Sequence, residues 1–115
     1  MHEYSITESI INIACEELKN INYTKINSIN IVIGKLNGFS PECIKFYFEF
    51  LSKDTEVENA ELKFTLKNIK LFCPECKKEF ETDEILFICH FCNNTKNLSI
   101  LSGKEFYIDD MEVQE

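Results

Sequence analysis

The chain has 115 residues, 44% of them hydrophobic. Its net charge is −8 because it contains 20 Asp and Glu residues but only 12 Lys and no Arg. This length and apolar fraction are typical of one folded domain, or of a small domain with an appended module, and they exclude a disordered chain. The acidic balance excludes an ordinary nucleic-acid-binding protein, because neutralising phosphates requires a basic surface.

The first residues contain neither the basic nor the apolar segment of a signal peptide, and no apolar run approaches the roughly 18 residues that span a membrane. We therefore expect a cytoplasmic protein with no nucleic-acid partner and no membrane partner. Six cysteines are present. Because cytoplasmic thiols stay reduced, they favour metal ligands or catalytic thiols over a disulfide framework.

The amino-terminal segment is predicted to be helical. Ser5 and Glu8 have the spacing of a capping box, in which the two side chains bond backbone amides of the first turn. We expect a helix over Ile6–Lys19, and its cap would hold residues 1–4 close to an ordered element. The apolar residues that follow at three- and four-residue spacing are Ile10, Ile11, Ala14, Cys15, Leu18 and Ile21.

A strand and a second helix come next. Ile29, Ile31 and Ile33 occur at every second position, which predicts a strand with one buried face. Ser40 and Pro41 predict a helix start, with an N-cap hydroxyl and proline at the first helical position. The following sequence, CIKFYFEFL, is apolar on nearly every side, so we expect this helix to be buried between other elements.

Further extended segments follow in the second half. Leu62, Phe64 and Leu66 again occur at every second position, and two more extended segments lie around residues 98–101 and 104–113. We therefore expect an α+β fold, with a small mixed sheet and two helices formed by residues 1–70 and 102–115. Residues 71–101 would form an inserted cysteine-bearing domain.

The insertion carries two C-x-x-C pairs, Cys73 with Cys76 and Cys89 with Cys92, separated by residues 77–88. Two such pairs joined by a short hairpin can place four thiolates around one Zn²⁺ ion. Four protein ligands leave no coordination position for water, so the ion is expected to be structural. The insertion is therefore predicted to be a zinc ribbon.

Other interpretations of the cysteines stay open at this point. A thioredoxin-like redox centre would use one pair and leave the other unexplained, and an iron–sulfur cluster could use all four thiols. A zinc-ribbon interaction module without a further function is a third alternative. His90 could replace one cysteine as a ligand, whereas Cys15 and Cys43 lie in apolar helical segments and are expected in the core.

The sequence MHE places several nitrogen donors within its first residues. They are the α-amine of Met1, the backbone amides of His2 and Glu3, and the His2 imidazole. Consecutive nitrogen donors form small chelate rings around a metal that accepts square-planar geometry, which favours Ni(II) or Cu(II) over zinc. The alternative is a solvated histidine at a frayed chain end.

Four segments in this order resemble the HypA/HybF family of nickel-insertion proteins: MHEYS at the start, IGKLNGFSPECIKFYFE at 33–49, the paired cysteines at 73–92, and SGKEFYIDDMEV at 102–113. The resemblance spans essentially the whole chain. It implies a nickel metallochaperone for [NiFe]-hydrogenase maturation, not an enzyme, with a contribution to urease maturation in some members. It also implies that the α/β domain binds nickel and that the insertion is a zinc ribbon.

The resemblance also implies roles for residues and partners. His2 would be the essential nickel ligand, Glu3 would supply an amide, and Met1 would supply its amine, while Cys73, Cys76, Cys89 and Cys92 would bind structural zinc. Members often carry an acidic residue before the second helix, where this chain has Ser40, with Glu42 two residues on. The implied partners are the GTPase HypB and the hydrogenase large-subunit precursor, and a homodimer is compatible with the sequence.

Overall fold

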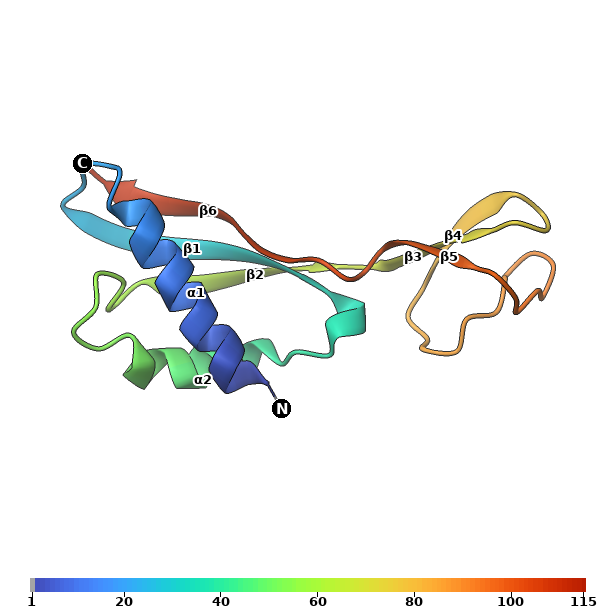
Figure 1. The fold of residues 1–115 in the computed structure, drawn as a ribbon, viewed down its shortest axis with the longest axis horizontal. Coiled ribbons are helices and arrows are strands. Elements are labelled where there is room, and N and C mark those ends of the chain that lie inside the picture. Colours follow the sequence, from blue (N-terminus) through green and yellow to red (C-terminus); the bar gives the residue numbers. More distant parts are fainter. Residues whose placement is uncertain (1) are drawn as a thin grey trace. The chain divides into compact units, whose positions relative to one another are not determined.

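The structure, a computed structural model, describes residues 2–115 and confirms the predicted α+β class (Figure 1). Two three-stranded sheets occur among these residues, with strand orders β2-β1-β6 and β4-β3-β5. The elements in chain order are α1 (Glu3–Leu18), β1 (Lys25–Gly34), the short 3₁₀ helix η1 (Lys35–Asn37), α2 (Pro41–Leu51), β2 (Glu61–Lys67), β3 (Ile69–Cys73), β4 (Lys78–Thr82), β5 (Ser99–Ser102) and β6 (Phe106–Gln114).

The chain separates into two compact units, which do not coincide with continuous halves of the sequence. The first unit contains the chain up to Val32, then Phe39–Thr65 and Tyr107–Glu115. The second unit contains Ile33–Gly38 and Leu66–Phe106. Within the described residues, neither α-helix combines the length and the apolarity that a membrane span requires.

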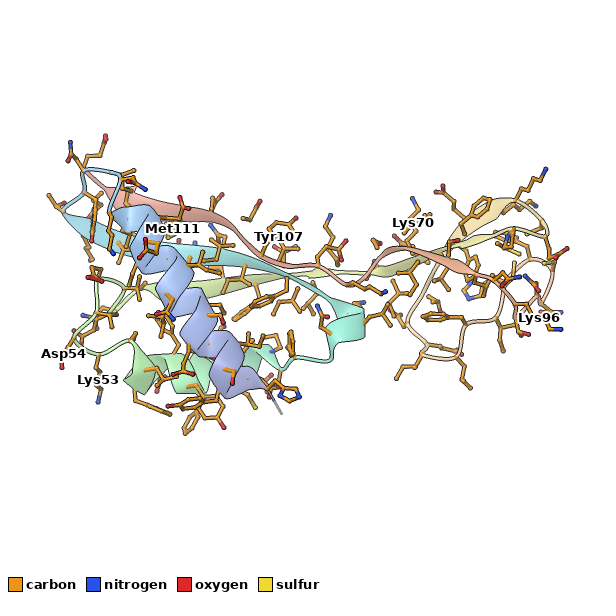
Figure 2. The ribbon with its side chains drawn as sticks, in the orientation of Figure 1. Lys53, Asp54, Lys70, Lys96, Tyr107 and Met111 are labelled. Carbon is orange, nitrogen blue, oxygen red and sulfur yellow. The ribbon has the colours of Figure 1, made fainter. Side chains whose placement is uncertain are left out.

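The first unit packs α1 and α2 against each other and beside the β2-β1-β6 sheet (Figure 1). Figure 2 shows Lys53 and Asp54 in the turn that follows α2, and Met111 on β6. The buried apolar side chains of this unit come from both helices, from β1 and β2, and from the segment after α2. They are Ile10, Ile11, Ala14, Leu18, Ile26, Ile29, Ile31, Val32, Ile44, Phe48, Val57, Ala60 and Leu62.

The first helix begins earlier than the sequence predicts, and the predicted capping box is wrong. His2 occupies the N-cap position without a side-chain cap bond, and its carbonyl accepts from the Ile6 amide at 2.9 Å. Ser5 therefore lies inside the first turn. The helix extends to Glu3 because the Glu3 carboxylate accepts a hydrogen bond from the backbone amide of Ser40, at 3.1 Å. The start of α1 is thus held by the hydrogen bond between Glu3 and Ser40 and not by the predicted bonds of Ser5 and Glu8.

The prediction that β1 buries one face is also wrong. The isoleucines at its alternate positions are buried as expected, but Ser28 and Val32 on the other face are only 1% and 5% exposed. β1 is the central strand of its sheet, so on each face its side chains are flanked by side chains of both β2 and β6. The alternation that the sequence suggests is therefore absent from the burial pattern.

The second helix starts as predicted but is not buried between other elements. The Ser40 hydroxyl accepts from the Cys43 amide at 3.2 Å, and Pro41 is the first helical residue. Ile44 and Phe48, which lie one turn apart, are the residues of α2 that are buried. The rest of its apolar surface, which includes Phe46 and the other exposed rings, faces solvent because a three-stranded sheet can cover only one side of a helix.

The second unit is built on β3, which pairs antiparallel with both β4 and β5. Its core consists of Ile69, Leu71, Cys73, Phe80 and Cys89. The early segment of the chain joins this unit at Gly34, whose amide donates to the Glu105 carbonyl at 2.7 Å. A Cβ atom at Gly34 would lie 2.0 Å from the Gly103 carbonyl oxygen, so only glycine fits this crossing.

Candidate metal sites

The first cysteine pair forms the turn of a β-hairpin. Cys73 is the last residue of β3, Cys76 lies in the turn, and β4 begins at Lys78, the register partner of Cys73. The Lys77 amide donates to the Cys73 carbonyl at 2.8 Å, and Lys77 has a positive φ of 58°. The expected hairpin between the two cysteine pairs is therefore wrong, since the first pair is itself the hairpin turn.

The second cysteine pair repeats this geometry in the connection between β4 and β5. The Asn93 amide donates to the Cys89 carbonyl at 3.0 Å, and Asn93 has a positive φ of 62°. The Cys89 amide also donates to the Asn94 carbonyl at 2.9 Å. Each C-x-x-C segment is thus a closed turn, in which the residue after the second cysteine adopts a left-handed conformation.

The two turns bring Cys73, Cys76, Cys89 and Cys92 together, with all four Sγ atoms within 4.8 Å of one another. The Sγ atoms of Cys73 and Cys92 are 3.7 Å apart, and those of Cys76 and Cys89 are 3.6 Å apart. A tetrahedral zinc ion with Zn–S bonds of about 2.3 Å requires sulfur atoms about 3.8 Å apart. The cluster therefore fits a four-cysteine zinc site.

Hydrogen-bond donors favour the thiolate form of two of the four cysteines, Cys73 and Cys89, whereas burial and the neighbouring thiols raise the pKa of Cys76 and Cys92. Burial opposes ionisation of Cys73, but the Cys76 amide and the Asn94 side chain outweigh it and lower the pKa of this thiol to about 6. The Asn94 side-chain nitrogen lies 3.5 Å from the Cys73 sulfur. Burial likewise opposes ionisation of Cys89, whose pKa is lowered by the Phe91 amide, 3.4 Å from its sulfur. Asn94 was missed from the sequence, where its position two residues after the second pair was the available signal.

The other histidine and cysteine candidates of the sequence, His90, Cys15 and Cys43, lie outside the cluster. His90 is exposed, and its ring packs against Phe80 with centroids 4.5 Å apart. Cys15 is half-buried and Cys43 is exposed, so the prediction that Cys43 lies in the core is wrong. The reason is that Cys43 precedes the inward-facing Ile44 and lies on the solvent side of α2.

The amino-terminal candidates lie at the first turn of α1. Met1 lies outside the described residues. His2 is exposed, whereas Glu3 is only 8% exposed. The Thr7 hydroxyl donates to the Glu3 carbonyl at 2.5 Å, and the Ser40 amide donates to the Glu3 carboxylate. The chain start is therefore anchored to the N-terminus of α2 through Glu3.

Ser40 takes part in two hydrogen bonds, of which the sequence predicted only the one that caps α2. Its amide donates to Glu3 while its hydroxyl accepts from Cys43 and caps α2. The position where the family resemblance implies an acid is thus occupied by Ser40, whose backbone amide holds the carboxylate of Glu3. Glu42 is exposed in the first turn of α2.

The Glu3 carboxyl is ionised over the whole physiological range. The positively charged amino terminus, together with the backbone amides of Ser40 and Glu3, lowers the pKa of this carboxyl to about 2. The first amides of a helix also make no i to i−4 backbone bond. A metal ion could therefore replace an amide proton here without breaking the helical hydrogen-bond ladder.

The chain is similar to known proteins over nearly its whole length. The family model described as "Hydrogenase/urease nickel incorporation, metallochaperone, hypA" matches residues 1–113. The chain is 36% identical over 114 residues to the hydrogenase maturation factor HypA of Caldanaerobacter subterraneus subsp. tengcongensis, covering 99% of this chain and 100% of that protein. It is 34% identical over 122 residues to HypA of Methanococcus maripaludis, covering 99% and 96%.

Solved structures show the same likeness. The solution structure of the nickel metallochaperone HypA from Helicobacter pylori matches with a TM-score of 0.65 and 27% identity, covering 99% of this chain and 98% of that one. A second HypA solution structure matches with a TM-score of 0.70 and 25% identity, covering 98% and 96%. Because the family model spans nearly the whole sequence, the chain belongs to the HypA family of nickel-incorporation metallochaperones that act in hydrogenase and urease maturation.

Proposed function

We propose that this protein binds Ni(II) at its amino terminus and delivers it during [NiFe]-hydrogenase maturation, with urease as a second recipient. The ligands would be the Met1 amine, the backbone amides of His2 and Glu3, and the His2 imidazole. The observation that supports this most is the Glu3–Ser40 hydrogen bond, which holds an exposed His2 at the start of an ordered helix. Nitrogen donors of this kind suit Ni(II) in a square-planar field.

The same arrangement suits a metal that must be released. Donors on successive residues of a chain end can be displaced by a partner one at a time. Since the first amides of α1 take no part in its i to i−4 backbone ladder, their return to the protonated state costs no bond of that ladder. Nickel is therefore cargo in this proposal, and no residue is assigned a catalytic role.

The second site is proposed to hold structural zinc through Cys73, Cys76, Cys89 and Cys92. Four thiolates at these separations would leave no open position on the ion. Residues 71–101 would form the zinc-ribbon domain, and residues 1–70 with 102–115 the nickel-binding domain. The proposed partners are the GTPase HypB and the hydrogenase large-subunit precursor.

Extending the chain by two residues before Met1 tests the nickel site. This extension turns the α-amine into an amide further along the chain and is expected to abolish tight Ni(II) binding in calorimetric titrations. The matched control adds the same two residues after Glu115, which leaves the donors intact. Equal nickel affinity in both extended proteins would favour the alternative function, a zinc-ribbon interaction module without a nickel role.

A further inference from the structure

An exposed cluster of aromatic rings lies in the first unit, beside the amino terminus. It consists of Tyr4 from α1 and Phe46, Tyr47 and Phe50 from α2, and we call it the aromatic patch. Tyr4, Phe46 and Phe50 are 46%, 61% and 42% exposed. Contiguous exposed apolar surface of this kind marks interaction sites, whereas isolated exposed residues do not.

The rings of the patch support one another. Tyr4 contacts Tyr47 edge to face with centroids 5.4 Å apart, which joins the two helices. Phe46 contacts both Tyr47 and Phe50 at 5.6 Å, and Tyr47 contacts Phe50 at 5.8 Å. Edge-to-face pairs of this kind are favourable, so the rings are already ordered before a partner arrives. A preorganised surface loses less entropy on binding.

A groove continues the patch along the two helices. It has a volume of about 180 Å³ and is lined by Glu8, Ile11, Asn12, Leu51 and Thr55. The patch and the groove are adjoining because Tyr4 and Glu8 lie one turn apart on α1, as Tyr47 and Leu51 do on α2. Together they offer projecting rings and a recess for a partner's side chains.

The border of the patch is acidic. Glu8 lies on the α1 side, and Glu42 and Glu49 lie on α2, all of them exposed. The Lys45 ammonium does not offset them, since it lies over the Phe64 ring, 5.7 Å from the centroid. Lys53 lies beyond the last turn of α2 (Figure 2). A second copy of this chain, with its net charge of −8, would bring a like-charged border to the same surface.

The patch is also tied to the proposed nickel site. Tyr4 follows Glu3 directly, and Glu3 accepts from Ser40, the N-cap of the helix that carries the other three rings. We propose that the aromatic patch docks the protein that exchanges nickel with the terminus, and that this protein offers an apolar centre bordered by Lys and Arg. The proposal rests on the proposed nickel function, because it assigns the docking surface of that same site.

Two double variants test the apolar and the charged part of this surface separately. The probes are purified HypB and the hydrogenase large-subunit precursor, titrated against the zinc-loaded protein. Phe46→Ser with Phe50→Ser is expected to raise the Kd for at least one probe about 30-fold, as loss of central interface rings does. Glu42→Lys with Glu49→Lys is expected to raise that Kd at low salt and to have less effect at high salt. These carboxylates are exposed, so the second variant keeps its fold.

Ile13→Ser is the matched control, because Ile13 is 49% exposed and the helical repeat places it on the opposite side of α1 from Tyr4. Its Kd should equal that of the unmodified protein. Unchanged affinity of both double variants, or no binding of either probe by the unmodified protein, would overturn the proposal. A change in self-association alone would also overturn it, because the patch would then serve a second copy.

Nickel titrations of the same variants separate this proposal from the nickel function. None of the substituted residues is a proposed ligand, so each variant should bind nickel as the unmodified protein does. If the unmodified protein binds no nickel, the proposed function fails. The probe titrations of the zinc-loaded, nickel-free protein still decide whether the aromatic patch is the docking surface.

Discussion

Replacing His2 with alanine is expected to abolish tight Ni(II) binding while zinc content and fold stay unchanged. The substitution removes the only imidazole of the proposed donor set. The loss should exceed the roughly 100-fold that removal of a group supporting a metal ligand causes, because a direct ligand is lost. His2 is exposed and makes no side-chain cap bond, so α1 should remain intact. Calorimetry gives the affinity, and circular dichroism checks the helix.

The only other histidine supplies the control for this experiment. His90 is exposed and packs on Phe80 beside the cysteine cluster. His90→Ala removes an imidazole of the same kind from the second unit and should leave nickel affinity unchanged. If His90→Ala weakens nickel binding as much as His2→Ala does, the amino-terminal site is contradicted.

Replacing Cys73 and Cys76 with serine is expected to unfold the second unit. Structural zinc contributes on the order of 10 kcal/mol to the folding of small zinc domains, and the sulfur atoms of Cys73 and Cys89 are themselves part of this unit's core. The variant should contain no zinc and should lose the amide dispersion of residues 66–106 in NMR spectra. Resonances of α1 and α2, which belong to the other unit, should persist.

Cys43→Ser is the matched control, because Cys43 is an exposed cysteine outside the cluster. It should retain one zinc ion and the full spectrum. A Cys73→Ser, Cys76→Ser protein that keeps the dispersed spectrum of the second unit would contradict a structural role for the metal.

Features that depend on neighbouring residues were predictable from the sequence. The start of α2 follows from a hydroxyl N-cap and a proline in adjacent positions, and the structure confirms it. The cysteine cluster was predictable because each C-x-x-C segment closes its own turn. The predicted hairpin between the two cysteine pairs was wrong. β4 pairs instead with β3, which precedes the first cysteine turn, because that turn closes the hairpin.

Features that depend on distant residues were not predictable in the same way. The start of α1 is fixed by Glu3 and Ser40, which are far apart in the sequence, and this contact outweighs the capping pattern at Ser5. The exposure of Phe46 and Phe50 was missed because hydrophobicity does not reveal how much sheet is available to cover a helix. The exposed rings that contradict that prediction are the ones that form the aromatic patch.

X-ray absorption of the protein loaded with both metals tests the central claim most directly, because each metal reports its own ligands. The account predicts that the nickel edge shows only nitrogen and oxygen neighbours in a planar arrangement, and that the zinc edge shows four sulfur neighbours. Sulfur scattering at the nickel edge, with zinc displaced, would place nickel at the cysteine cluster and contradict the amino-terminal site.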